Sequence, residues 1–212
     1  MNRRILSVSL AAVLATSLPT SAGADSSPAI AAESPKAINL TNVPGPDGGV
    51  AWGRAEGVVA ARTERVLSVL QDYGHYVGLF PHFQKSKVLS KRGGDALVYL
   101  EAEILHGTAT LWSQVRMRSR SPEPDHHVVE ARKLAGRGKG NVAALIARWE
   151  ISPTEDKQST HVVFSLLVDP ALPVPDALVS YEMKRSAGKA FKALRKRVAA
   201  PASYAGAQRR TF

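Results

Sequence analysis

The sequence predicts an α+β domain in which one antiparallel sheet packs against helices. Segments that alternate apolar and polar residues follow one another between about residues 86 and 168, separated only by short turns. Strands joined by short turns pair antiparallel, because a parallel pair needs a long crossover connection. Two short helical patterns precede these segments, and one long helical pattern follows them. Helices placed before and after a run of strands are typical of the α+β class.

Length and composition allow one domain of ordinary size. The chain has 212 residues, of which 44% are hydrophobic and 22% charged, close to the averages of soluble globular domains. It contains no cysteine, which excludes disulfides, zinc–thiolate sites and thiol catalysis. We therefore expect a monomeric domain over residues 49–199 that is stabilised by its hydrophobic core alone.

The N-terminal residues have the pattern of a secretory signal peptide over residues 1–24. Asn2-Arg3-Arg4 gives a short positive segment, and the stretch from Ile5 to Leu18 is uncharged and mostly apolar. Ala22-Gly23-Ala24 supplies the small residues that a signal peptidase requires, so we expect cleavage after Ala24 and a periplasmic or secreted protein. A retained membrane anchor is the alternative, and the shortness of the apolar stretch argues against it.

The domain is preceded and followed by segments of low complexity. Residues 25–48 are rich in Ser, Pro, Ala and Gly, which predicts a flexible linker. Residues 200–212 follow the last helical pattern and are predicted to be a disordered basic tail.

The first elements of the domain are a strand and two short helices. The strand is predicted from Trp52 to Ala60, and Thr63 is a plausible N-cap for the helix that follows. A second short helix is predicted from Asp72 to Phe80-Pro81, because a residue before proline disfavours helix. Further strands complete a sheet of about seven; they are predicted at residues 86–89, 98–104, 111–118, 127–134, 145–151 and 161–168.

A long helix closes the domain, with Asp176 as its N-cap and its end near Val198. Its apolar residues recur at helical spacing: Met183, Ala187, Ala190, Phe191, Leu194 and Val198. The middle of the helix is unusually small, with Ser186, Ala187 and Gly188 in succession. This segment fits two interpretations, close packing of the helix on the sheet or the roof of a ligand cavity.

Residues capable of metal binding or acid–base chemistry are scattered. None of the six histidines forms an H-E-x-x-H motif, and His126 and His127 would face opposite sides of a strand. No G-x-S-x-G motif is present, and the glycine-rich segment 136–140 lies between strands, where a hairpin turn is expected. Glu101 and Glu103 share one face of a strand and fit a solvated face better than a catalytic carboxylate pair. We therefore expect no metal, no cofactor and no catalytic residue.

Positive charge accumulates towards the C-terminus of a chain whose formal net charge is +10. No acidic residue follows Glu182, whereas the last helix is rich in lysine and arginine. An exported protein has little access to nucleic acid, so we expect an anionic membrane surface as the partner of this helix rather than nucleic acid; a simple solvated face is the alternative. The residues expected to face the membrane are Lys184, Lys189, Lys192, Arg195 and Lys196.

The order of elements and a few short motifs resemble the START-like, or SRPBCC, helix-grip superfamily, and most of all its polyketide cyclase and coenzyme Q-binding branch. The resemblance covers about residues 50–198 and includes the following motifs: Val66-Leu67-x-Val69-Leu70-x-Asp72, Tyr76-x-x-x-Phe80-Pro81, Val88-Leu89, Arg148-Trp149-Glu150-Ile151 and Pro170-x-x-Pro173. It implies a curved sheet wrapped around the C-terminal helix, with an apolar molecule such as a lipid, quinone or polyketide held between them. It carries over no catalytic residues.

The resemblance and the strand pattern together predict which residues line the ligand cavity. Tyr76, Phe80 and Phe83 are expected to form an aromatic lid at its mouth. The remaining lining residues are expected on strands and on the last helix: Val98, Leu100, Val115, Met117, Trp149, Met183, Ala187 and Phe191. The leading hypothesis is an exported carrier of a hydrophobic small molecule. A cyclase or dehydratase acting in the same cavity, or an interaction domain whose cavity is filled by its own side chains, are the alternatives.

Overall fold

The computed structural model describes residues 37–45, 49–80, 82–104, 109–171 and 173–200. The predicted signal peptide, most of the predicted linker and the predicted tail beyond residue 200 lie outside the described residues.

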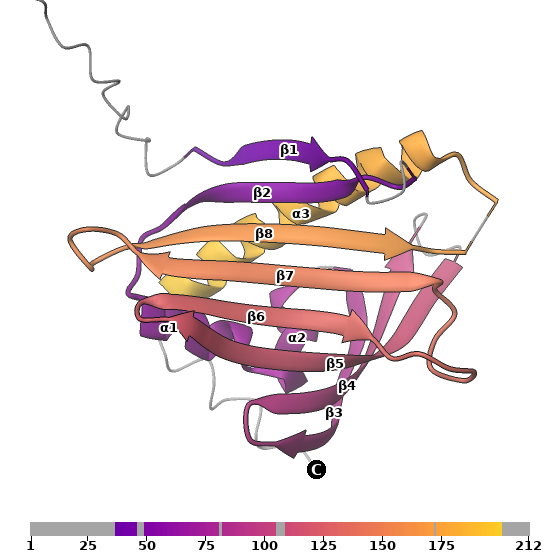
Figure 1. Cartoon of the computed structure of the whole chain (residues 1–212), viewed down its shortest axis with the longest axis horizontal. Helices are drawn as coiled ribbons and strands as arrows, with labels where there is room; N and C mark the ends of the chain where they lie inside the picture. The colour runs from indigo at the N-terminus through magenta and orange to yellow at the C-terminus, as the bar shows by residue number, and fades with distance from the viewer. Residues whose placement is uncertain (1–36, 46–48, 81, 105–108, 172, 201–212) are drawn as a thin grey trace, which may run out of the picture. The chain divides into compact units, whose positions relative to one another are not determined.

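In the described part of the chain, eight strands form one antiparallel sheet in the order β1-β2-β8-β7-β6-β5-β4-β3 (Figure 1). Every neighbouring pair in this order is antiparallel, which confirms the predicted α+β class. The strands are β1 Asn39–Val43, β2 Trp52–Val59, β3 Phe83–Arg92, β4 Asp95–Ile104, β5 Ala109–Glu123, β6 His126–Lys133, β7 Ala144–Pro153 and β8 Thr160–Asp169.

The helices lie behind the sheet in Figure 1, on the side that we call its inner face; the opposite side is its outer face. They are α1 Thr63–Leu70, the 3₁₀ helix η1 Tyr73–His75, α2 Tyr76–Leu79 and α3 Asp176–Ala199. The long helix α3 contacts β1, β2 and β8, whereas η1 and α2 contact β3. No helix within the described ranges is long and apolar enough to cross a membrane.

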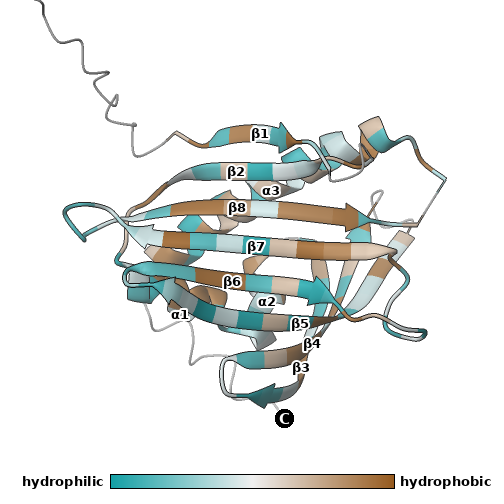
Figure 2. Cartoon of the chain, viewed as in Figure 1, coloured by the Kyte–Doolittle hydropathy of each residue, from teal (hydrophilic) through white to brown (hydrophobic). Residues whose placement is uncertain are grey.

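Alternation along the strands separates the two faces of the sheet. In β2, buried Ala55 and Val59 alternate with half-buried Arg54 and Glu56. Successive side chains of a strand point to opposite faces, so the buried set faces the helices and the charged set faces outward. Figure 2 shows the same alternation of hydrophilic and hydrophobic residues along several strands, whereas β8 is apolar over most of its length.

The structure corrects the predicted linker and the predicted number of strands. Residues 39–43, placed in the flexible segment 25–48, form β1 and pair with β2, with Val43 opposite Trp52. This short strand has one inward apolar residue, Leu40, so it lacks the alternation from which a strand is predicted. The sheet therefore has eight described strands rather than seven.

Several predicted boundaries are also wrong. Strand β3 spans ten residues instead of the predicted 86–89, because its lysines and arginines obscure the alternation of an edge strand. Strand β5 continues to Glu123, beyond its predicted end at residue 118. Thr63 and Asp176 are the first residues of α1 and α3, and the N-cap positions belong to Arg62 and Pro175.

Helix α3 lies very close to the sheet at two glycines. A Cβ atom built on Gly53 of β2 would lie 2.1 Å from the backbone carbon and oxygen of Met183. A Cβ atom built on Gly188 would lie 3.0 Å from a methyl carbon of Leu40 in β1. Glycine at these positions lets helix and sheet approach closely. Close packing of the helix on the sheet therefore explains why the segment of small residues in the middle of α3 includes Gly188.

Candidate ligand-binding site on the inner face of the sheet

A chain of aromatic rings runs across the inner face from α2 to β8. The ring centroids of Tyr76 and Phe80 are 5.1 Å apart, and those of Phe80 and Trp149 are 6.2 Å apart. Trp149 stacks in turn on Phe164, with a centroid distance of 3.9 Å. Phe83 joins the chain beside Tyr76 and Phe80. This cluster offers an extended apolar surface with flat faces, which suits ring-bearing or acyl ligands.

The hydroxyl groups around this cluster are held by backbone carbonyls. The Tyr76 hydroxyl donates to the carbonyl oxygen of Leu70 at 2.5 Å. Burial raises the pKa of Tyr76 well above its ordinary value, so the phenol stays protonated. The Ser86 hydroxyl donates to the carbonyl oxygen of Tyr73 at 2.5 Å. These groups are engaged in the fold, so the site presents mainly apolar surface to a ligand.

Strands β4 and β5 contribute aliphatic side chains to the same face. Val98 lies directly opposite Val115, and Leu100 directly opposite Ser113. Val98 and Val115 are fully buried, as is nearly all of Met117. All four predicted residues of these strands therefore face inward, as their alternation indicated.

Helix α3 contributes Ala187 and Phe191, both fully buried. Met183 is half-buried, and its sulfur accepts a hydrogen bond from the backbone N–H of Val168 at 3.3 Å. The structure thus places the predicted lining residues in one hydrophobic cluster, with Phe83 at its margin, but leaves Met183 outside it, over β8.

Two aromatic members of the cluster were not among the predicted lining residues. Phe164 lies opposite Trp149 in the register of β7 and β8, and Tyr73 lies edge-on to Tyr76 at a centroid distance of 5.9 Å. Phe164 occurs in an apolar stretch of β8 where alternation gives no direction. Predicting that Phe164 contacts Trp149 would have required knowing which strand pairs with β8.

Two histidines flank α2, at the predicted mouth of the cavity. His75 Nδ1 lies 2.7 Å from Asp72 Oδ1, and both side chains are exposed. His82 Nε2 lies 3.2 Å from Lys189 Nζ of α3. Partial burial, and then the charge of Lys189, lower the pKa of His82, although Glu182 opposes this effect. His82 therefore joins the segment after α2 to the middle of α3.

Glu101 and Glu103, expected on a solvated face, lie on the outer face of β4, away from this cluster. Glu101 bonds Lys85 Nζ at 2.9 Å and the Tyr99 hydroxyl at 2.7 Å. Its contacts with Lys85 and Tyr99 lower the pKa of Glu101, so the carboxylate is ionised and engaged. Within the described ranges, no group of three or more His, Asp or Glu side chains is arranged to hold a metal ion.

The predicted membrane-facing residues do not share one environment. Lys192 and Lys196 are exposed, whereas Lys184 and Lys189 are half-buried. Arg195 Nη2 donates to the carbonyl oxygens of Ala37 and Val58 at 2.9 and 2.6 Å, and its guanidinium lies 5.0 Å from the centre of the Phe191 ring. The assignment of Arg195 to the membrane surface is therefore corrected: it ties α3 to the edge of the sheet.

A sheet wrapped over a long C-terminal helix, with an apolar inner face, defines a START-like helix-grip domain. The model of the family described as polyketide cyclase / dehydrase and lipid transport matches residues 59–195, so the chain belongs to that family. Among curated proteins, none matches the chain.

Solved structures agree with this fold. The STAR-related lipid transfer protein of Xanthomonas axonopodis has a TM-score of 0.67 at 16% identity, over 79% of this chain and 96% of its own. Human StAR-related lipid transfer protein 5 has a TM-score of 0.66 at 14% identity, over 77% and 82%. The Zhui aromatase/cyclase of a Streptomyces species has a TM-score of 0.54 at 18% identity, over 76% and 94%. Identities this low establish the shared fold alone.

Proposed function

We propose that the protein is an exported carrier that binds a hydrophobic small molecule, such as a lipid, a quinone or a polyketide-like compound, on the inner face of its sheet. The observation that carries this proposal is the aromatic chain from Tyr76 through Phe80 and Trp149 to Phe164, placed between the sheet and the helices. The lipid transport in the description of its family supports the same conclusion.

The hydroxyl groups favour binding over catalysis. Acid–base chemistry needs side chains free to exchange protons with the substrate. The Tyr76 and Ser86 hydroxyls instead donate to main-chain carbonyls. Ser113 on the inner face makes only long contacts, 3.4 Å to the carbonyl oxygens of Gln114 and Lys139, so it is one hydroxyl that a cyclase or dehydratase activity could use. The likeness to an aromatase/cyclase keeps this alternative open to test.

The solvent-facing side of α3 supports a membrane as the source of the cargo. Leu178 and Tyr181, near its N-terminal end, are 50% and 60% exposed although both are large and hydrophobic. Lys192 and Lys196 lie exposed further along the helix. Residues 178, 181, 185, 192 and 196 fall on one side of a helix with 3.6 residues per turn. An apolar end followed by basic residues suits the interface of an anionic bilayer.

Tryptophan fluorescence tests the binding site directly. The chain has three tryptophans, of which Trp52 and Trp112 occupy outward positions of β2 and β5. The double variant Trp52→Phe, Trp112→Phe retains Trp149 and is titrated with a short-chain ubiquinone or a brominated fatty acid. We expect saturable quenching, because these probes quench on contact. The control Trp149→Phe should lose that saturable phase. Equal quenching in the two variants, or none in the first, would contradict the site.

The substitution Ala187→Phe tests where the ligand lies. Ala187 is fully buried and belongs to the same core cluster as Phe191. If ligand space exists beneath it, the new ring fills that space, and probe binding falls while the melting temperature is retained. If side chains already fill it, the ring overpacks the core and costs about 1–3 kcal/mol. Marked destabilisation would favour a domain filled by its own side chains.

Vesicle sedimentation tests the membrane partner. We expect the wild-type protein to bind vesicles that contain phosphatidylglycerol and to leave vesicles of phosphatidylcholine alone. Changing Lys189, Lys192 and Lys196 to Glu should abolish binding, because each nearby cation contributes about 1 kcal/mol. Unaltered binding in this variant would make the basic side of α3 a solvated surface.

N-terminal sequencing of the mature protein tests export, which predicts a chain that begins after Ala24.

A further inference from the structure

The outer face of the sheet carries charged side chains, several of which form ion pairs within single strands. Arg148 Nε lies 2.7 Å from Glu150 Oε1 in β7, and Arg54 Nη2 lies 2.9 Å from Glu56 Oε2 in β2. Such contacts neutralise the arginines locally, as expected of a solvated sheet face. The part of this face formed by β5 and β6 departs from that pattern.

Two arginines of this part lie directly opposite each other. Arg116 of β5 is the register partner of Arg132 in β6. Side chains directly opposite in an antiparallel pair have Cβ atoms about 5 Å apart, and like charges at this position destabilise the sheet. Arg116 forms no ion pair with any residue that the structure describes. The repulsion between Arg116 and Arg132 therefore destabilises the sheet, and no carboxylate paired with Arg116 offsets it.

The neighbouring ion pairs are long. Arg132 Nε lies 3.5 Å from Glu130 Oε1, and Arg118 Nε lies 3.5 Å from Asp95 Oδ2. These distances exceed those of the two paired arginines described above, and charge-assisted hydrogen bonds are about 2.7–2.9 Å long. The guanidinium groups of Arg132 and Arg118 are thus held only loosely by their carboxylates. Both side chains are also well exposed, at 60% and 48%.

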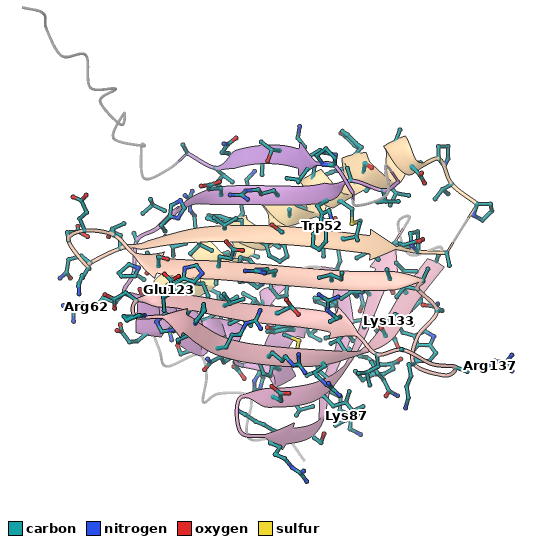
Figure 3. The ribbon with its side chains drawn as sticks, viewed as in Figure 1. Trp52, Arg62, Lys87, Glu123, Lys133 and Arg137 are labelled. Carbon is teal, nitrogen blue, oxygen red and sulfur yellow. The ribbon has the colours of Figure 1, made fainter. Side chains whose placement is uncertain are left out.

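These side chains border a surface depression of about 310 Å³. It is lined by Arg116, Arg118, Glu130, Arg132 and Lys133, with Leu134 and Ala135 at its margin. We call it the arginine depression. Three arginines against one carboxylate leave it positive, since Lys133 is the register partner of inward-facing Val115. Lys133 lies near the end of β6, whereas Arg137 extends away from the sheet at the tip of the connection to β7 and takes no part (Figure 3).

We propose that the arginine depression binds a phosphate group, either as a free phosphate or as the phosphate of a lipid headgroup. Guanidinium groups match the geometry of phosphate oxygens and bind them through paired hydrogen bonds. A phosphate between Arg116 and Arg132 would convert their repulsion into two attractions. The site lies on the opposite face of the sheet from the hydrophobic site, so it stands or falls independently of the proposed carrier function.

Binding of inorganic phosphate by the full chain is measured by isothermal titration calorimetry, and binding to phosphatidylcholine vesicles with and without phosphatidic acid by sedimentation. We expect Arg116→Gln and Arg132→Gln each to weaken binding by about tenfold or more, the cost of losing a charge-assisted contact. Arg120→Gln is the matched control, because Arg120 is exposed on the same strand and lies opposite Val128, outside the depression. It should bind like the wild type.

Thermal unfolding provides a second measurement that does not depend on the titration. A ligand that binds only the folded state raises the melting temperature. Phosphate should therefore raise that of the wild type and of Arg120→Gln more than that of Arg116→Gln, whereas without phosphate Arg116→Gln should melt no lower than the wild type. Binding of free phosphate assigns a soluble ligand. Without it, binding to phosphatidic acid vesicles assigns a lipid headgroup if it persists when Lys189, Lys192 and Lys196 are changed to Glu and is lost in Arg116→Gln. Failure of both, or equal losses in Arg116→Gln and Arg120→Gln, overturns the proposal.

Discussion

Substituting Gly53 by alanine tests how closely α3 is seated on the sheet. The added methyl carbon would lie 2.1 Å from the backbone carbon and oxygen of Met183. Backbone atoms cannot rotate away, so relief requires α3 and β2 to separate by about 1.4 Å to reach ordinary contact distance. Overpacking costs about 1–3 kcal/mol and occasionally more. We expect Gly53→Ala to lie at the upper end, about 3 kcal/mol, because the obstacle is main chain.

Two other glycines provide graded controls. At Gly188 the added carbon meets only the side chain of Leu40, at 3.0 Å, and the gain in helix propensity of about 1 kcal/mol offsets the crowding. At Gly78 in α2 nothing lies within 4 Å, so alanine should be neutral or stabilising by up to about 1 kcal/mol. Denaturant unfolding at constant m-value gives the three free energies, and the melting temperature of Gly53→Ala should fall by about 6–12 °C. A loss below about 1 kcal/mol in Gly53→Ala, or the same loss in all three variants, would refute the close approach.

Three further results are expected. Trp149→Ala should lower the free energy of unfolding by about 3–5 kcal/mol in urea titrations, because the side chain is 4% exposed and stacked against Phe80 and Phe164. Arg195→Met should cost about 1–3 kcal/mol by leaving two backbone carbonyls without their donor, whereas Lys192→Met at an exposed position should stay within about 0.5 kcal/mol. The pKa of His82 is lowered in the folded state, so the unfolded chain binds protons more readily as the pH falls through about 6.5. The melting temperature should therefore drop in that pH range, and His82→Gln should reduce the drop.

The alternation of apolar and polar residues sufficed to predict most strands and their inward faces. Val98, Val115 and Trp149 face inward as expected, since a half-buried strand has a period of two that needs no knowledge of its partners. The two edge strands were predicted poorly. β1 has a single inward apolar residue, and β3 is interrupted by charges that protect an edge from pairing with other chains. An edge strand lacks a neighbour on one side, so its sequence pattern is shaped by the need to avoid pairing there as well as by the buried core.

The site was predicted less completely, because contacts between distant segments depend on register and on the depth to which a helix is seated. Phe164 reaches Trp149 only through the pairing of β7 with β8, which local pattern does not specify. The environment of the charged residue Arg195 could not be predicted from the local pattern either. Its sequence neighbours Lys192 and Lys196 are exposed, but Arg195 lies a quarter turn nearer the sheet and bonds main-chain oxygens there. A positive charge in the sequence does not reveal whether its partner is solvent, a ligand or the fold itself.

The two cationic surfaces of the protein should therefore respond differently to anions. The lysines of α3 are spaced along a helix, where attraction to a bilayer depends on total charge and is screened by any salt. Arg116 and Arg132 are fixed opposite each other in a sheet, so the oxyanion between them must match their spacing. Replacing sodium chloride by sodium phosphate at constant ionic strength should leave vesicle binding by α3 unchanged and should raise the melting temperature through the arginine depression. If chloride and phosphate act alike on the melting temperature, the arginines respond to ionic strength alone and the depression is not a specific site.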